Sequence, residues 1–131
     1  MMIVDILKII KKKSDEQEAL SIVYREPDGS LNYYHVIPYL VEPTFFQGLT
    51  NRGTFSFQYT CVIALEEQGH SQHLSWRRIK SEKKMIVLPG ARRPVYFQQL
   101  TEEEKYILMR AVFTGKAIIV ADYIIVEQGE R

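Results

Sequence analysis

The segment from Thr54 to Leu65, TFSFQYTCVIAL, alternates large apolar side chains with smaller or polar ones. Successive side chains of a β-strand point to opposite faces, so the alternation predicts one strand with an apolar face. We expect that face to carry Phe55, Phe57, Tyr59, Cys61, Ile63 and Leu65. Other parts of the chain must cover it, and this requirement constrains the fold more than any other feature.

The preceding forty residues also have β character. Residues 20–24 are rich in strand formers, and the turn at 27–30 contains Asp-Gly, a strong hairpin signal. A second strand is expected over 31–41, at a sheet edge or bent at Pro38, because proline cannot donate to a ladder. Residues 42–53 are predicted to form a loop whose Phe45 and Phe46 cap the core.

After the alternating segment we expect a polar turn around Gly69, a returning strand over 73–80, a second turn and a strand over 85–88. That hairpin would place Leu65 opposite His73 and Cys61 near Arg77. About five short strands at this spacing are typical of small barrels and sandwiches.

The two ends of the chain carry helix signals. Ile3, Ile6, Leu7 and Ile10 recur at helical spacing before a group of lysines, which favours a docked N-terminal helix over a first strand or a membrane or partner helix. Thr101 with Glu104 forms a capping box, which predicts a helix over 102–114. The apolar run 117–126 predicts a final strand buried on both faces, which completes the sheet or exchanges with a second copy.

These elements predict a mainly β (α+β) fold in one domain spanning residues 1–131. Its β core, about residues 19–90, is expected to be a small SH3/Sm-like barrel or a strongly bent antiparallel sheet. A single cysteine excludes a disulfide framework and fits a reducing compartment. No apolar run approaches the ~20 residues that span a bilayer, and the lysines follow the first apolar stretch, unlike a signal peptide. We therefore expect a cytoplasmic protein with no membrane partner.

Catalytic, metal and cofactor chemistry find no support in the sequence. In the expected hairpin the imidazole of His73 lies about 13 Å along the ladder from Cys61, too far for a nucleophile and its base. His70 and His73 are expected to be solvated turn residues, and His35 a hydrogen-bonded, half-buried one. Asp122 interrupts an apolar run, so it requires a partner such as an Arg, an exposed edge or a function. No phosphate-loop, dinucleotide or hydrolase motif is present, and we expect no catalytic residue, metal ligand or cofactor.

Positive charge is concentrated between residues 77 and 93, a segment that contains seven Lys and Arg residues and one Glu. With Tyr33, Tyr34 and Tyr59 on neighbouring strands, this segment could form a β face on which bases stack and cations hold phosphates. The alternative is a solvated edge whose lysines discourage strand pairing. Arg77 and Arg78 would point to opposite faces of a strand, so only one of them could belong to such a site. The expected ligand-binding residues are Trp76, Arg78, Lys80, Lys83, Lys84 and Arg92.

The order of features over residues 19–80 resembles the WYL domain family. The residues that carry the resemblance are Ile22, Tyr24, Asp28-Gly29, Pro38, Val41, Tyr59 and Arg78-Ile79. The name-giving tripeptide is not intact, and Gln72 and Ser75 stand where the family has arginines, so only Arg78 carries over as a ligand contact. The resemblance implies an SH3/Sm-like barrel and a ligand-sensing module that binds nucleic acids or nucleotides through a basic pocket.

The sequence thus favours a non-enzymatic binding module that recognises a nucleotide or single-stranded nucleic acid through a basic, aromatic β face. The competing hypothesis is a structural or protein–protein interaction subunit, for example a phage or mobile-element accessory protein. There the aromatic residues Tyr33, Tyr34, Phe45 and Phe46 and the apolar last strand would contact a protein partner. A homodimer is compatible with either hypothesis.

Overall fold

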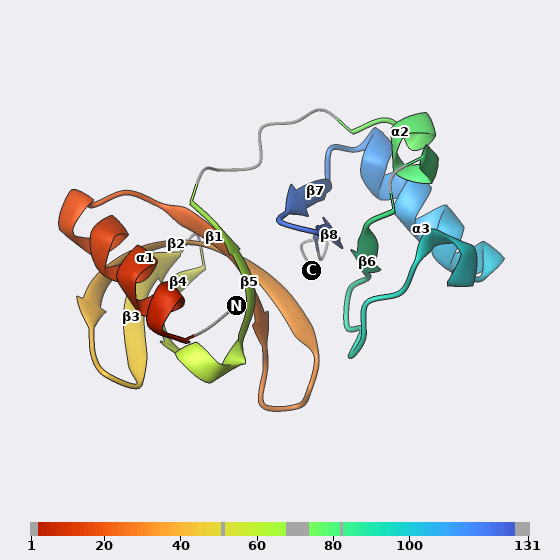
Figure 1. Cartoon of the computed structure of the whole chain (residues 1–131). Helices are drawn as coiled ribbons and strands as arrows, with labels where there is room; N and C mark the ends of the chain where they lie inside the picture. Colours follow the sequence, from red (N-terminus) through yellow and green to blue (C-terminus); the bar gives the residue numbers. More distant parts are fainter. Residues whose placement is uncertain (1–2, 51, 68–73, 82, 128–131) are drawn as a thin grey trace.

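The structure is a computed structural model, and it describes residues 3–50, 52–67, 74–81 and 83–127. Within these ranges the chain forms two β-sheets, each accompanied by helix (Figure 1). The first sheet has five strands in the order β4-β3-β2-β1-β5, and the second has three in the order β6-β8-β7. The expected α+β fold rich in β-strands is confirmed.

The N-terminal segment is a helix, α1 (Ile3–Glu16), and not a strand. Ile6 and Ile10 recur on one face and are buried against the five-stranded sheet, where α1 packs on β2. Lys13 in the last turn is also largely covered, and its Nζ lies 3.0 Å from a carboxylate oxygen of Glu18. The apolar stripe of α1 therefore covers one face of the sheet.

All neighbouring strands of the first sheet are antiparallel. The strands are β1 (Leu20–Arg25), β2 (Leu31–Val41), β3 (Phe45–Thr50), β4 (Gly53–Gln58) and β5 (Val62–Glu66). The expected turn joins β1 to β2, with Gly29 at a φ of 89° that few other residues adopt. The bend expected at Pro38 coincides with a register shift between β2 and β3. Phe45 and Phe46 belong to β3, so the loop predicted over 42–53 is wrong, although Phe46 does lie fully in the core.

The alternating segment 54–65 is not one strand. It consists of β4 and β5, separated by a 3₁₀ turn, η1 (Tyr59–Cys61). Because β4 and β5 are the two edges of the same sheet, the chain must cross from one edge to the other within three residues. The sheet is bent strongly enough to allow this, yet no ladder joins β4 to β5 among the residues described, so the barrel is not closed.

Two tyrosines hold the bend. The Tyr24 hydroxyl on β1 accepts a hydrogen bond of 2.9 Å from the backbone N–H of Gln58 at the end of β4. The Tyr59 hydroxyl donates to the carbonyl oxygen of Glu42 at 2.8 Å. Inside the bend, the rings of Tyr24, Phe57 and Tyr34 meet edge to face. Aromatic packing and a cross-sheet hydrogen bond together fix the curvature.

The second sheet corrects two predictions. Its elements are α2 (Trp76–Ser81), β6 (Met85–Val87), η2 (Phe97–Gln99), α3 (Glu102–Phe113), β7 (Ala117–Val120) and β8 (Tyr123–Val126). The segment expected to return as a strand over 73–80 is helical at α2, because the Ser75 hydroxyl accepts from the Arg78 N–H and Ile79 anchors the turn in the core. The final apolar run is a hairpin and not one strand, because the chain reverses at Ala121, whose φ is 51°.

The helix predicted over 102–114 is confirmed as α3 (Glu102–Phe113). The Thr101 hydroxyl accepts from the Glu104 N–H at 3.2 Å, and the Glu104 carboxylate accepts from the Thr101 N–H at 2.9 Å. The helix ends before Gly115, at a φ of 73°. The strand expected over 85–88 is confirmed as β6, which pairs in parallel with β8.

A shared apolar cluster joins the two sheets. The outer face of the first sheet contributes Val23, Leu31 and Ala64, and the second sheet contributes Val87, Ile118, Val120 and Ile125. The Leu31 N–H also donates to the Ala91 carbonyl at 3.0 Å, and the Ala121 N–H donates to the Glu66 carboxylate at 3.2 Å. The β7–β8 hairpin thus lies against β1 and β5.

Candidate nucleic-acid interface

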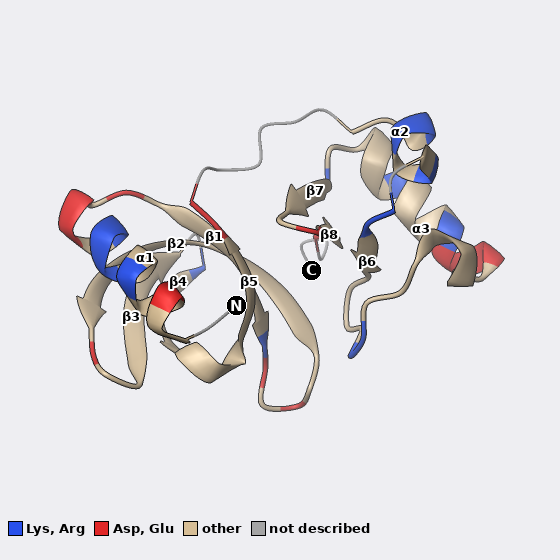
Figure 2. Ribbon diagram, in the orientation of Figure 1, with Lys and Arg blue, Asp and Glu red and all other residues tan. Residues whose placement is uncertain are grey.

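Four of the expected cations, Arg78, Lys80, Lys83 and Lys84, lie on α2 or directly after it, next to Arg77. Ile79 is 1% exposed and fixes α2 to the second core cluster, so Arg77 and Lys80 project into solvent, as does Lys83 after the helix. Figure 2 shows this concentration of basic residues on α2. Since the segment is helical, the expectation that Arg77 and Arg78 alternate across a strand is wrong. On a helix, residues three apart share a side, which places Arg77 and Lys80 close together.

The side chains of Arg78 and Lys84 are less exposed than those of their neighbours Arg77, Lys80 and Lys83. Arg78 is half-buried and forms part of the capping geometry of α2, in which its carbonyl oxygen accepts a 2.8 Å hydrogen bond from the Ser81 hydroxyl. The Lys84 ammonium donates to the Ala121 carbonyl at 3.1 Å and thereby supports the turn between β7 and β8. Lys84 therefore has a structural role in addition to any ligand contact.

Trp76 begins α2 and is half-buried. Its ring packs against Phe97 at 5.5 Å between centroids and an interplanar angle of 67°. The ammonium of Lys105 lies 5.6 Å from the centroid of the same Phe97 ring. Part of the indole therefore belongs to the core of the second sheet, and the remainder is at the surface beside the cations of α2.

The tyrosines expected beside these cations lie elsewhere. Tyr34 and Tyr59 are buried in the first core cluster, and Tyr33 is half-buried at the contact between the two sheets. The structure therefore does not bring the tyrosines of the first sheet together with the basic residues. The aromatic component of the predicted face is reduced to Trp76.

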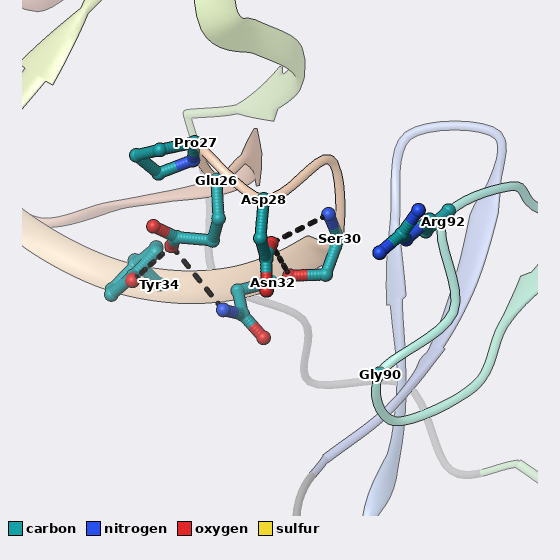
Figure 3. Close-up of a pocket in the computed structure, with 8 residues that line it drawn as sticks. All are labelled: Glu26, Pro27, Asp28, Ser30, Asn32, Tyr34, Gly90 and Arg92. Carbon is teal, nitrogen blue, oxygen red and sulfur yellow. Dashed lines mark hydrogen bonds between the residues drawn. The ribbon is translucent and has the colours of Figure 1, made fainter.

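Arg92 lies in a different place from the other expected ligand residues, in the loop after β6. It lines a polar pocket of about 540 Å³ together with Gly90 and the β1–β2 turn (Figure 3). Hydrogen bonds from Ser30 hold the pKa of the Asp28 carboxyl below its ordinary value, and the positive charge of Arg92 acts in the same direction. Arg92 thus contributes to the electrostatic environment of Asp28 across this pocket, while Ser30 supplies the hydrogen bonds to that carboxylate.

Glu26 is a further acceptor in this pocket, one that the sequence did not predict. One oxygen of its carboxylate accepts from the Tyr34 hydroxyl and, at 3.2 Å, from the side-chain amide of Asn32. Burial raises the pKa of Tyr34 above its ordinary value, and the hydrogen bond to Glu26 raises it further. Figure 3 shows the two carboxylates and Arg92 around the same hollow. Two carboxylates repel a phosphate, so we do not place the phosphate contacts here.

A second pocket, of about 780 Å³, lies where β4 ends and η1 begins. Its lining includes Ile3 of α1, Tyr24 and Phe45, and it is more apolar than the pocket of Arg92. Glu26 and Pro27 border both pockets. None of the described residues that line it is a cation, so these residues offer no charge for a phosphate group.

The remaining chemistry-bearing residues form no site in the described part of the chain. No group of three His, Cys, Asp or Glu side chains there could hold a metal ion, while His70 and His73 lie outside the described residues. Cys61 ends η1 and is half-buried. Its expected place opposite the 73–80 strand is wrong, because β5 pairs with β1.

His35 differs in part from expectation, whereas Asp122 matches one of its expected alternatives, exposure to solvent. His35 is exposed and not half-buried, and its Nδ1 lies 3.3 Å from the Ser21 hydroxyl. Asp122 lies exposed in the β7–β8 turn, where its carbonyl accepts from the Met85 N–H at 3.1 Å. A solvated carboxylate needs no arginine partner, and this explains a charge within an apolar run.

None of the helices described is long and apolar enough to cross a membrane. Comparison of the chain with protein-family models, curated proteins and solved structures found no match.

Proposed function

We propose that this chain is a non-enzymatic binding module for a nucleotide or a single-stranded nucleic acid, and that α2 with the residues after it supplies the phosphate contacts. The observation that carries the proposal is the solvent exposure of Arg77, Lys80 and Lys83, none of which forms an ion pair with any described residue. Cations exposed in this way are available to phosphates.

The other expected residues extend this surface. Trp76 stands at the start of α2 and offers part of an indole for base stacking, while Arg78 and Lys84 flank the exposed cations in sequence. Arg92 is outside this surface because it lies in the loop after β6, where it lines the pocket at the β1–β2 turn. The same class of ligand is implied by the resemblance to WYL domains, which stays a prediction.

The test is fluorescence anisotropy of labelled single-stranded DNA and RNA, with Lys80→Glu/Lys83→Glu compared with wild type. The matched control is Lys8→Glu/Lys11→Glu. It makes the same change in net charge at exposed lysines of α1, the helix that covers the first sheet. We expect saturable binding at low salt that falls at least tenfold in the α2 variant and changes little in the control. Competition by a mononucleotide distinguishes a nucleotide pocket from a strand-binding surface.

The absence of saturable binding at tens of micromolar protein and low salt would contradict the proposal. An equal loss of affinity in both double variants would also contradict it, because it would indicate attraction by net charge and not by a site. Circular dichroism of both variants must match that of wild type.

A structural or protein–protein interaction subunit is the second candidate, and the exposed side of α3 favours it. Tyr106 is 58% exposed and Phe113 74% exposed, two turns apart on one side of the helix. Large apolar side chains exposed in this way are common at protein interfaces. A Tyr106→Ala/Phe113→Ala variant should then lose binding to a partner protein, and that binding should resist added salt.

A further inference from the structure

Strand β4 is an open edge of the five-stranded sheet. Five of its six residues are exposed, and only Phe57 is buried. Its sequence, GTFSFQ, contains no charge and no proline, and its ladder with β3 runs without a bulge. Proteins commonly protect an edge strand with a charged side chain, a proline or a β-bulge, and β4 has none of these three.

The hydrogen bonds around β4 show which backbone groups face outward. The Tyr59 N–H donates to the Thr44 carbonyl at 3.3 Å, continuing the β3 side of the ladder, whereas the Gln58 N–H points away from β3 to the Tyr24 hydroxyl. Antiparallel ladders alternate residue by residue. Thr54 and Ser56, which share the parity of Gln58, therefore direct their backbone N–H and C=O groups away from β3. No residue in the described ranges bonds these groups.

The other sheet edges are covered within the chain. Ile86 of β6 exchanges two hydrogen bonds with Val95, of 2.7 and 3.0 Å. Strand β5 contacts β7, three of its five residues are buried, and all four residues of β7 are buried. A head-to-tail assembly in which β4 of one copy pairs with β5 of the next is therefore blocked by the second sheet.

We propose that β4 pairs antiparallel with β4 of a second copy, about a two-fold axis at Phe55. In this register Thr54 of each copy lies opposite Ser56 of the other, and the outward N–H and C=O groups of both residues make four reciprocal hydrogen bonds. The edge is self-complementary because Thr54 and Ser56 are symmetric about Phe55, and because no charge meets its like across the axis. The Phe55 side chains, 38% exposed in one chain, then meet each other.

This dimer is expected to be weak. Four backbone hydrogen bonds and one aromatic pair form an interface well below the standard size of about 1,600 Å². The second sheet and α2 lie away from β4 in Figure 1, so dimerisation and oligonucleotide binding should be separable.

The test is sedimentation velocity over a range of about 5 to 500 µM, where a weak dimer would form. In Thr54→Lys/Ser56→Lys, each new lysine faces another lysine across the axis, and dimerisation should weaken at least tenfold. In Thr54→Lys/Ser56→Glu, each lysine faces a glutamate of the other copy, and the dimer should be restored. Both variants remove the Ser56 hydroxyl, which accepts an exposed 3.2 Å hydrogen bond from the side-chain amide of Gln47.

A wild-type chain that stays monomeric throughout this range would overturn the proposal. So would a dimer that tolerates both lysines, or one that the Lys/Glu variant fails to restore. Hydrogen exchange of the wild-type chain gives a reading that does not depend on how the variants fold: the Thr54 and Ser56 amides should gain protection with concentration. Protection of these amides by an added extended peptide in a monomeric chain would overturn the dimer in favour of peptide addition.

Discussion

The hydroxyl of Tyr24 on β1 accepts the backbone N–H of Gln58 on β4, although these strands are not neighbours in the sheet and the residues are 34 positions apart. This hydrogen bond crosses the inside of the bend and caps the end of β4. Its geometry explains how an open sheet keeps a curvature close to that of a barrel without a closing ladder.

Tyr24→Phe should therefore destabilise the chain while leaving its ring packing on Phe57 in place. The Gln58 N–H would lose its acceptor in a partly buried position, at a cost of about 1–3 kcal/mol. Urea denaturation monitored by far-UV circular dichroism measures this. Tyr39→Phe is the matched control, because its hydroxyl bonds Gln47 at the exposed surface. Equal midpoints for the two variants would show that the cross-sheet hydrogen bond does not hold the bend.

Tight packing between β2 and β3 gives a second prediction. A Cβ added at Gly48 would lie 2.2 Å from a methyl carbon of Val36 and 3.2 Å from the Ile37 carbonyl oxygen. Gly48→Ala should cost about 1–3 kcal/mol through overpacking. In Gly48→Ala/Val36→Ala the clash with the methyl is removed, so the double variant should lose less stability than the sum of the two single variants. Strict additivity in a thermal or urea denaturation series would contradict this coupling.

Stability should fall at alkaline pH because burial raises the pKa of Tyr24, Tyr33, Tyr34 and Tyr59. Above about pH 10 the unfolded chain releases these protons first, so the native state binds more protons and its stability decreases as pH rises. The effect is absent below about pH 9.

Tyr34→Phe isolates one contribution to this loss. It removes a tyrosine whose pKa is raised by burial and by Glu26. The decline of the free energy of unfolding between about pH 9.5 and 11 should therefore become shallower by at most about 1.4 kcal/mol per pH unit. Urea midpoints measured across this range give the slope. Parallel slopes for the variant and wild type would mean that Tyr34 does not titrate differently in the folded and unfolded chains.

The separation of Arg92 from α2 can be tested through salt dependence. If α2 contacts phosphates, Arg77→Ala should lower the log–log salt slope of oligonucleotide binding by about 1. Arg92→Ala should leave this slope unchanged, because Arg92 lines a pocket that also contains the carboxylates of Glu26 and Asp28. The measurement is anisotropy at four or more salt concentrations. Equal changes in slope would place Arg92 within the phosphate surface after all.

Local signals in the sequence were sufficient for some elements. The capping box of Thr101 and Glu104 and the Asp28-Gly29 turn are each determined within a few residues, and both predictions are confirmed. Pro38, expected at a sheet edge or a bend, lies in the interior strand β2 at a register shift. The other elements depend on distant contacts. Helix α2 has six residues, of which Ile79 alone is buried, so its helical spacing cannot be distinguished from that of a strand. The β7–β8 turn has no glycine that would signal it in the sequence, because it is Ala121 that adopts the positive φ.

The candidate site was less predictable than the fold. The clustering of basic residues is visible in the sequence, but the partners of Lys84 and Arg92 come from residues 37 positions or more away. The burial of Tyr34 follows from the bend of the sheet, which no local pattern encodes. Glu26 was missed because its role depends on the hairpin register that brings Tyr34 within reach.

The apolar cluster shared by the two sheets also has a thermodynamic consequence. Because Val23 and Ala64 of one sheet are covered by Ile118 and Ile125 of the other, neither sheet can unfold without exposing apolar surface on its partner. The chain should therefore melt in one cooperative transition, in which the loss of either half removes the support of the other. A ligand bound on α2 would then raise the melting temperature of α1 as much as that of α2, although α1 packs on the first sheet.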